Sequence, residues 1–187
     1  MKKRILSLIL ALSMVLSVLP LGAFAADPLP ELVMGATGYP VCSNGTKGDG
    51  WEYSGGILTL TNGSYDFNYF NPKTHGGGST EQTVHCGIKL EQNATITGGD
   101  FGASVTNDKG TISGGFQSTG SVTNEGTITG NGIFAGIVTN NRFISGGTFK
   151  GKVTNWSTIS GGTFQNTCSV TNNGTIKDNA IFEGEAK

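Results

Sequence analysis

Charged residues are scarce in this chain, and those present nearly cancel. The 187 residues include 12 Lys and Arg against 13 Asp and Glu, for a formal net charge of −1. A protein that binds DNA or RNA presents a basic face or stripe to the phosphate backbone. The sequence offers no such patch, so we expect no nucleic-acid partner.

Histidine and cysteine are also rare, which limits the metal and cofactor chemistry open to the chain. The two histidines and the cysteines Cys42, Cys86 and Cys168 have no zinc-site spacing. We therefore expect no metal and no cofactor. A disulfide is allowed outside the cell, and Cys42–Cys86 is the pairing that stays within one region of the chain. Cys168 then stands alone, either as a small apolar core residue, which we favour, or as an intermolecular link.

The first 25 residues have the order of an export signal. The basic residues 2–4 precede an apolar run over residues 5–21, and Ala23-Phe24-Ala25 forms a small-residue cleavage site. The alternative, a retained membrane anchor, is disfavoured by Pro20 and by that cleavage site. We expect residues 1–25 to be a signal peptide. The rest of the chain should then be secreted, extracellular or on the cell surface, with no membrane contact after cleavage.

Glycine is abundant, with 31 residues, and glycine-rich chains can be disordered. Three apolar columns spaced by about 16 residues argue for order instead, because such periodicity means that stacked units share one core. The isoleucine column is Ile96, Ile112, Ile128, Ile144, Ile159 and Ile176. The phenylalanine column is Phe101, Phe116, Phe134, Phe149, Phe164 and Phe182. The valine column is Val105, Val122, Val138, Val153 and Val170.

The repeat is too short for a pair of helices and has the alternation of strands. Small polar residues flank each apolar one, as in Thr-Ile-Ser and Val-Thr-Asn, and glycine pairs mark the corners. We predict an all-β fold, a parallel β-helix or β-solenoid with short three-sided coils of about 16 residues. Residues 26–94 should form an N-terminal cap and irregular first coils, and residues 95–187 the regular repeats. The pattern does not determine the handedness.

A column of asparagines accompanies the valines. Each asparagine follows its valine by two residues, and stacked amides can pass hydrogen bonds from coil to coil. The alternative is that each is an ordinary turn residue, but five in register favour the ladder. Its members are Asn107, Asn124, Asn140, Asn155 and Asn172.

Several phrases resemble those of a known group of proteins. The segments Gly48-Asp49-Gly50-Trp51-Glu52-Tyr53 and Leu58-Thr59-Leu60, and the Ile-Ser-Gly-Gly-Thr-Phe repeats, resemble exported surface proteins of Gram-positive bacteria. Those proteins carry parallel β-helical segments, some described as carbohydrate-binding. The resemblance implies a polysaccharide or a host or cell-wall glycan as partner, and it assigns no ligand residue. No wall-anchoring motif is present, so we expect the protein either to be released or to carry further domains in a longer chain.

Aromatic side chains are the candidate glycan-binding residues, because their rings can pack on the apolar faces of sugars. We select Trp51, Tyr53 and Trp156. The alternative for Trp51 and Tyr53 is that they cover the open first coil. Trp156 is the better candidate, because it follows the asparagine column by one position and should lie outside.

The same outer row argues against catalysis. It consists of Asp108, Glu125, Asn141, Trp156 and Asn173, which is thinly acidic and interrupted by an aromatic residue. Cleavage of an acidic polysaccharide would need clustered carboxylates with basic residues nearby. We expect a non-catalytic glycan-binding or adhesive module rather than an enzyme. The main alternative is a purely structural stalk or spacer of a larger surface protein, and a polysaccharide lyase or hydrolase is the third.

Overall fold

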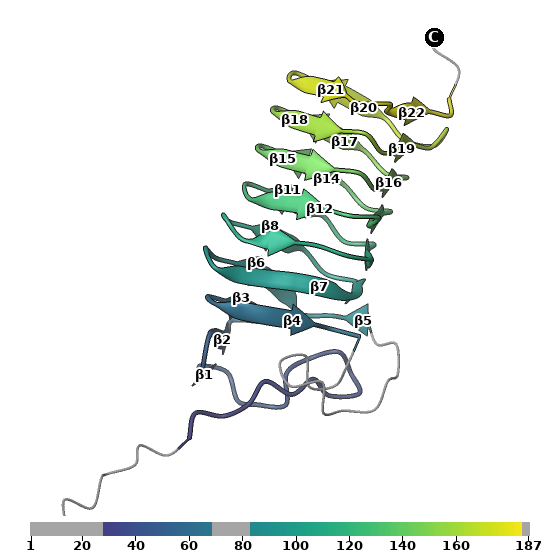
Figure 1. The fold of residues 1–187 in the computed structure, drawn as a ribbon. Coiled ribbons are helices and arrows are strands. Elements are labelled where there is room, and N and C mark those ends of the chain that lie inside the picture. Colours follow the sequence, from purple (N-terminus) through teal and green to yellow (C-terminus); the bar gives the residue numbers. More distant parts are fainter. Residues whose placement is uncertain (1–27, 69–82, 185–187) are drawn as a thin grey trace, which may run out of the picture.

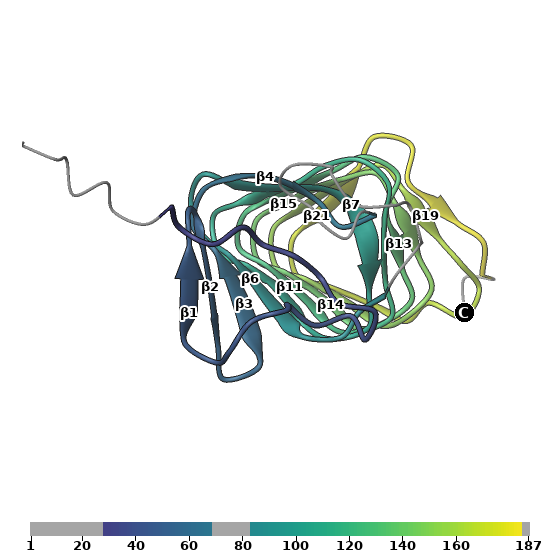
Figure 2. The same ribbon diagram turned by 90° about the horizontal axis from the view of Figure 1, so that it is seen from below.

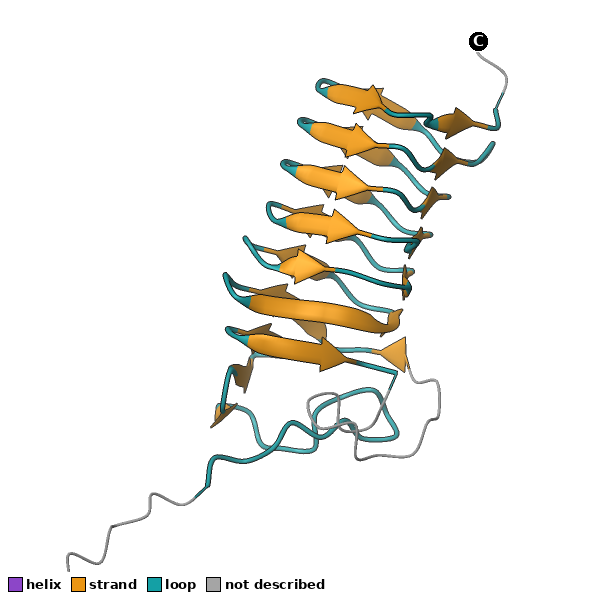
Figure 3. Cartoon of the chain, in the orientation of Figure 1, coloured by secondary structure: helices purple, strands orange, loops and turns teal. Residues whose placement is uncertain are grey.

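The chain folds into a column of stacked β-coils (Figure 1). The computed structural model describes residues 28–68 and 83–184, in which every regular element is a β-strand (Figure 3). The strands form a parallel β-solenoid of about six turns, with successive turns about 17 residues apart. The predicted all-β solenoid is therefore confirmed. The predicted signal peptide, residues 1–25, lies outside the described residues. Within them, no helix is long and apolar enough to span a membrane.

Each coil has three faces, which enclose the core when the column is viewed along its axis (Figure 2). The first face carries the Val-Thr-Asn segments, and its parallel strands are β3 (Ile57–Leu60), β6 (Gly87–Leu90), β8 (Val105–Asn107), β11 (Val122–Asn124), β14 (Val138–Asn140), β17 (Val153–Asn155) and β20 (Val170–Asn172). The second face carries the isoleucines on β9 (Thr111–Ile112), β12 (Thr127–Thr129), β15 (Phe143–Ser145), β18 (Thr158–Ser160) and β21 (Thr175–Lys177). Its first strand is β4 (Gly63–Asp66), where Tyr65 takes the isoleucine position and pairs with Ile96.

The third face carries the phenylalanines. Its strands are β5 (Thr83–Val84), β10 (Phe116–Ser118), β13 (Ile133–Phe134), β16 (Thr148–Phe149), β19 (Thr163–Phe164) and β22 (Ile181–Phe182). The long strand β7 (Ala94–Phe101) pairs with β4 and β9 on the second face and with β5 and β10 on the third. It therefore turns the corner that separates these two faces in the later coils.

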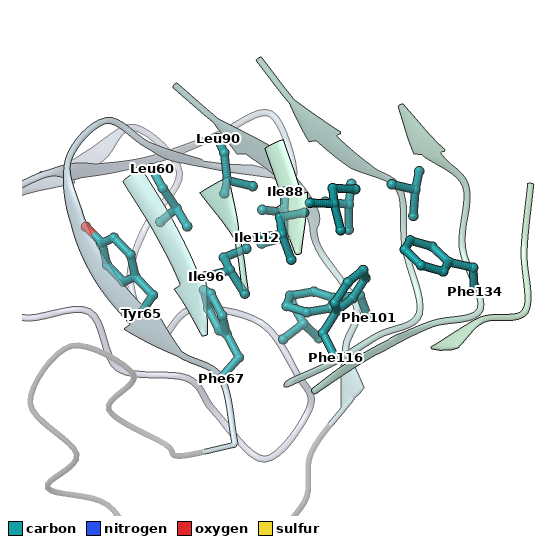
Figure 4. Packing of buried hydrophobic residues seen from close by; sticks show 14 of the residues in the cluster. Leu60, Tyr65, Phe67, Ile88, Leu90, Ile96, Phe101, Ile112, Phe116 and Phe134 are labelled. Atoms are coloured by element: carbon teal, nitrogen blue, oxygen red, sulfur yellow. The ribbon is translucent and has the colours of Figure 1, made fainter. Parts of the chain in front are cut away.

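Like residues stack on like residues in the valine, isoleucine and asparagine columns. The predicted phenylalanine column departs at one coil, where Ser118 and not Phe116 pairs with Phe101 and Phe134. Phe116 is also buried, but it lies two residues earlier on the same strand. Val122 pairs with Val105 and Val138, and Ile144 pairs with Ile128 and Ile159. A slip of one residue would move a whole column from the core to solvent, so burial fixes this register. The rings of Phe134 and its neighbour Phe149 lie 4.8 Å apart, centroid to centroid and nearly parallel, which matches the spacing between paired strands. Figure 4 shows the same inward packing in the first coils.

Tight corners follow the isoleucine strands, and most of them need a positive φ. Gly146 and Gly147 have φ values of 82° and 100°, a region that glycine enters without steric cost. The corner of the last coil has Asp178 and Asn179 instead, with φ values of 57° and 59°. Asp and Asn are the non-glycine residues that tolerate this region best.

The N-terminal end of the column is covered. Strands β1 (Thr46–Gly48) and β2 (Trp51–Ser54) form an antiparallel meander with β3, which then pairs in parallel with β6. Leu32, Met34 and Trp51 are buried in the same core as the first coils. The Tyr65 hydroxyl lies 2.8 Å from the Gly50 carbonyl oxygen, its hydrogen-bond acceptor, and burial raises the pKa of Tyr65 to about 12. This cap is the kind of atypical end that repeat proteins need.

Replacing Ile144 by Asp should destabilise the fold strongly, because the carboxylate would enter the fully buried isoleucine column. We expect the free energy of unfolding to fall by about 3 kcal/mol or more, measured by urea denaturation. The control is Thr154→Asp, whose side chain lies on the outer side of β17 between two buried neighbours; it should cost less than about 1 kcal/mol. Equal losses in the two variants would contradict the inside–outside assignment.

Candidate functional site

The outer row beside the asparagine column combines a fixed backbone with exposed side chains. The amides of Glu125, Asn141, Trp156 and Asn173 each donate to the carbonyl of the asparagine one coil earlier, at 2.7–2.8 Å. These four side chains are exposed, and Asp108 is half-buried. The Trp156 side chain is 59% exposed and is the only tryptophan in the row. The row therefore presents one large aromatic surface at a position held by coil-to-coil bonds.

The other two predicted aromatic residues lie elsewhere. Trp51 is only 3% exposed and belongs to the core cluster under the first coil, so its ring faces are covered and cannot stack on a sugar. This corrects its selection as a glycan-binding residue and agrees with the alternative of a cap. Tyr53 is half-buried against the same core. Trp51 and Tyr53 lie on β2, and Trp156 directly follows β17. Five strands lie between β2 and β17 in the first sheet. The three residues do not form one platform.

The five asparagines form a ladder inside the corner next to the row. Each Nδ2 donates to the Oδ1 of the next asparagine at 2.7–2.8 Å, from Asn107 to Asn172. Each of these Nδ2 groups also reaches a carbonyl of the next coil, for example from Asn124 to Phe143 O at 3.0 Å. The ladder begins at Asn107 because the coil below has Leu90 at this position. The amides therefore pair the polar groups of a buried corner, a structural role.

A shallow polar groove on the third face was not predicted from the sequence. It encloses about 230 Å³ and is lined by Asn68, Asp100, Gly115, Phe116, Gln117, Asn131 and Ile133. Gln117 pairs with Asp100 below and Ile133 above in the sheet. The alternation around Phe101 and Phe116 could place these residues outside. It could not reveal a groove, because the outward residue differs from coil to coil on this face.

The part of the chain that the structure describes contains no cluster of potential metal ligands. No three His, Cys, Asp or Glu side chains there gather as a metal site. Hydrogen bonds from Ser160 (2.6 Å) and Lys177 lower the pKa of Asp178. Lys177 Nζ lies 3.3 Å from its carboxylate, and both side chains are exposed. This pair belongs to the last corner, where Lys177 ends the strand β21 and Asp178 follows it.

Cys42 and Cys86 belong to neighbouring segments at the cap. The His85 amide donates to Gly38 O at 2.9 Å, and the rings of His85 and Tyr39 lie 6.4 Å apart. Cys86 is buried, which raises its pKa to about 12, and Cys42 is half-buried against the same core. The structure records both as free thiols. The expected disulfide is not formed in it, but the two segments that would carry the bond pack together.

Comparisons with known proteins add no identity. No protein-family model, curated protein or solved structure matches the chain. The solenoid fold therefore rests on the structure, and the resemblance to Gram-positive surface proteins stays a prediction.

Replacing Asn140 by Ala should destabilise the column although the residue is polar. The change removes one of the partners of Asn124 Nδ2 and of Asn155 Oδ1. It also removes the side-chain oxygen that accepts from the Arg142 amide and the Nδ2 group that donates to the Thr158 carbonyl. We expect a loss of about 2 kcal/mol or more in the free energy of unfolding. The control is Asn141→Ala, one residue further on and exposed, which should change stability by less than about 0.5 kcal/mol. A silent Asn140→Ala would show that the ladder carries no stability.

Oxidation should link Cys42 to Cys86. Treatment with an oxidised small-molecule disulfide would transfer the two thiol hydrogens and their electrons to the reagent, and peptide mapping should recover the Cys42–Cys86 pair with Cys168 reduced. The bond should raise the melting temperature, with a limit of about 4 kcal/mol on the chain-entropy model. Cys168→Ser should keep this gain and Cys42→Ser should lose it. A disulfide that involves Cys168 would contradict the pairing.

Proposed function

We propose that this protein is an exported, non-catalytic module that binds polysaccharide or a host or cell-wall glycan through its outer row. The observation that carries the proposal is the Trp156 ring, 59% exposed on a backbone held by coil-to-coil hydrogen bonds. A large aromatic ring that is already exposed on a fixed backbone offers a sugar an apolar face. Little conformational entropy of the protein is then lost when the sugar binds. The proposal accounts for a tryptophan where the other coils have Asp, Glu or Asn.

The neighbours of Trp156 supply polar groups for sugar hydroxyls. Asn141 lies one coil below it and Asn173 one coil above, both exposed, at the spacing of paired strands, about 4.8 Å per coil. Amide side chains donate and accept hydrogen bonds at once, as hydroxyl recognition needs. An aromatic ring flanked by two amides is a small site, so we expect weak binding to single sugars and stronger binding where several repeats of a polymer engage.

The absence of catalysis is part of the proposal. Hydrolysis of a glycosidic bond needs two carboxyls on either side of the bond, one of them held protonated by a dry environment. The two acids of the row, Asp108 and Glu125, lie in adjacent coils, where Glu125 is exposed and Asp108 half-buried. Such an open surface keeps both acids in contact with water, which supports binding over chemistry.

The second candidate function is that of a structural stalk. The observation in its favour is the regularity of the column, in which the valine, isoleucine and asparagine positions repeat in register to the last coil. A spacer needs only such a rod and no ligand. A glycan-binding module should lose binding when an outward side chain of its site is changed, whereas a stalk has no glycan binding to lose.

Truncation of Trp156 should abolish most glycan binding. We expect the purified chain to bind a subset of polysaccharides on a glycan array, and Trp156→Ala to weaken that binding at least ~10-fold, about 1.4 kcal/mol. Trp156→Phe should retain part of it. The matched control is Ile137→Ala, which removes another exposed apolar side chain (53%) at a different corner and should bind as the unaltered chain does.

Three outcomes would count against the proposal. Binding that survives Trp156→Ala would place the site elsewhere, with the groove at Asp100 and Gln117 as the next surface to test. No binding to any glycan would favour the stalk. Release of reducing or unsaturated sugar from the bound polymer would contradict the non-catalytic assignment.

A further inference from the structure

The last coil exposes the columns that every earlier coil buries. Phe182 is 54% exposed, whereas Phe164 one coil below is 1% exposed. Val170 and Ile176 are half-buried, although Val153 and Ile159 are fully buried. A hollow of about 570 Å³ opens at this end of the column. Its lining is Val170, Asn172, Ile176, Lys177, Asp178, Asn179, Ala180 and Phe182. The end is therefore an apolar surface framed by polar residues, typical of an interaction site.

Three strand edges meet at the same end. β20 is the last strand of the first sheet, and β21 and β22 are the two ends of the other sheet, so each pairs with one described strand only. The amide ladder ends here as well. Asn155 Nδ2 donates to both Asn172 Oδ1 and Thr175 O in the next coil, but Asn172 Nδ2 donates only to Gly174 O in its own corner. Unpaired strand edges are templates for pairing with another chain.

The opposite end of the column cannot offer the same surface. The cap residues Leu32, Met34 and Trp51 are buried against the first coils, and the outermost strand β1 is short and polar. The ion pair between Lys47 and Glu52, 3.1 Å apart, lies across β1 and β2. Short, charged edge strands resist further pairing. In the part of the column that the structure describes, one end is therefore covered and the other has unpaired strand edges.

We propose that two copies of this chain associate end to end through their last coils. The partner is a second copy because the open surface is self-complementary: antiparallel edge strands exchange N–H and C=O groups, and the apolar columns of one copy would cover those of the other. The contact continues the interface between coils that already builds the column. Since the other end is capped, a two-fold contact of this kind closes at a dimer and does not propagate into a fibre. Lys177 and Asp178 neutralise each other at the rim, so like charges do not oppose the contact.

The test is the mass and shape of the purified chain in solution. Light scattering coupled to size exclusion should give the mass of a dimer at about 50 μM. Small-angle scattering should give a maximum dimension nearly twice that of one column. Phe182→Lys should weaken the dimer at least 100-fold. Ile137→Lys, at a residue of nearly equal exposure on the flank of the column (53% against 54%), should leave it intact.

Several results would overturn the proposal. A monomer at all concentrations would mean that the open end has another occupant, and filaments would mean that the cap does not block pairing. A dimer whose maximum dimension is close to that of one column would be packed side by side. The small-angle scattering of the unaltered chain decides this without any variant. Equal loss of the dimer in Phe182→Lys and Ile137→Lys would show that the contact is not at the end. Circular dichroism of both variants checks that the strands are retained.

Discussion

Stacking of like on like is the constraint on which the whole structure depends. A coil can bury its inward residues only if the coil above also places inward residues in the same register, because each coil covers one side of its neighbour. The pairs Val138 on Val122 and Ile144 on Ile128 satisfy this requirement directly. The ladder extends it to a polar group, since an amide with donor and acceptor on opposite sides can repeat without limit. Apolar burial and hydrogen bonding thus select the same register.

That constraint separates the residues that build the column from those that can carry a function. The inward positions are held by every neighbour above and below, so they can change little. The outward positions repeat the backbone bonds but not the side chains, as in the row with Glu125, Asn141 and Trp156. Function in such a fold is therefore expected at departures from the repeat. Trp156 places a large aromatic side chain on an outward position with a fixed backbone, which is why we propose it as the glycan-binding residue.

The sequence predicted what depends on periodicity and missed what depends on long-range packing. The valine, isoleucine and asparagine columns, the three faces and the corner glycines all follow from spacing, because each coil repeats the same local physics. The position of Phe116 does not, since it lies two residues before the register of Phe101 and Phe134. The burial of Trp51 does not follow, since its burial depends on Leu32 and Met34 reaching under the first coil. The residues next to a tryptophan in the sequence do not show whether distant segments will cover its ring. The groove at Asp100 and Gln117 was missed for a related reason: the shape between outward side chains is set by three neighbouring coils together.

The two described ends of the column differ in whether the stacking pattern is interrupted. At the N-terminal end the repeat stops by substitution: Leu90 takes the place of an asparagine, and an antiparallel meander covers the first coil. At the other end the described chain keeps the pattern to Asn172, Ile176 and Phe182 without changing it. A coil that follows the pattern is made to be covered, because its columns and edges are half of an interface. Exposure of that half costs free energy in proportion to the apolar area left in water, which is the physical argument for the end-to-end association that we propose.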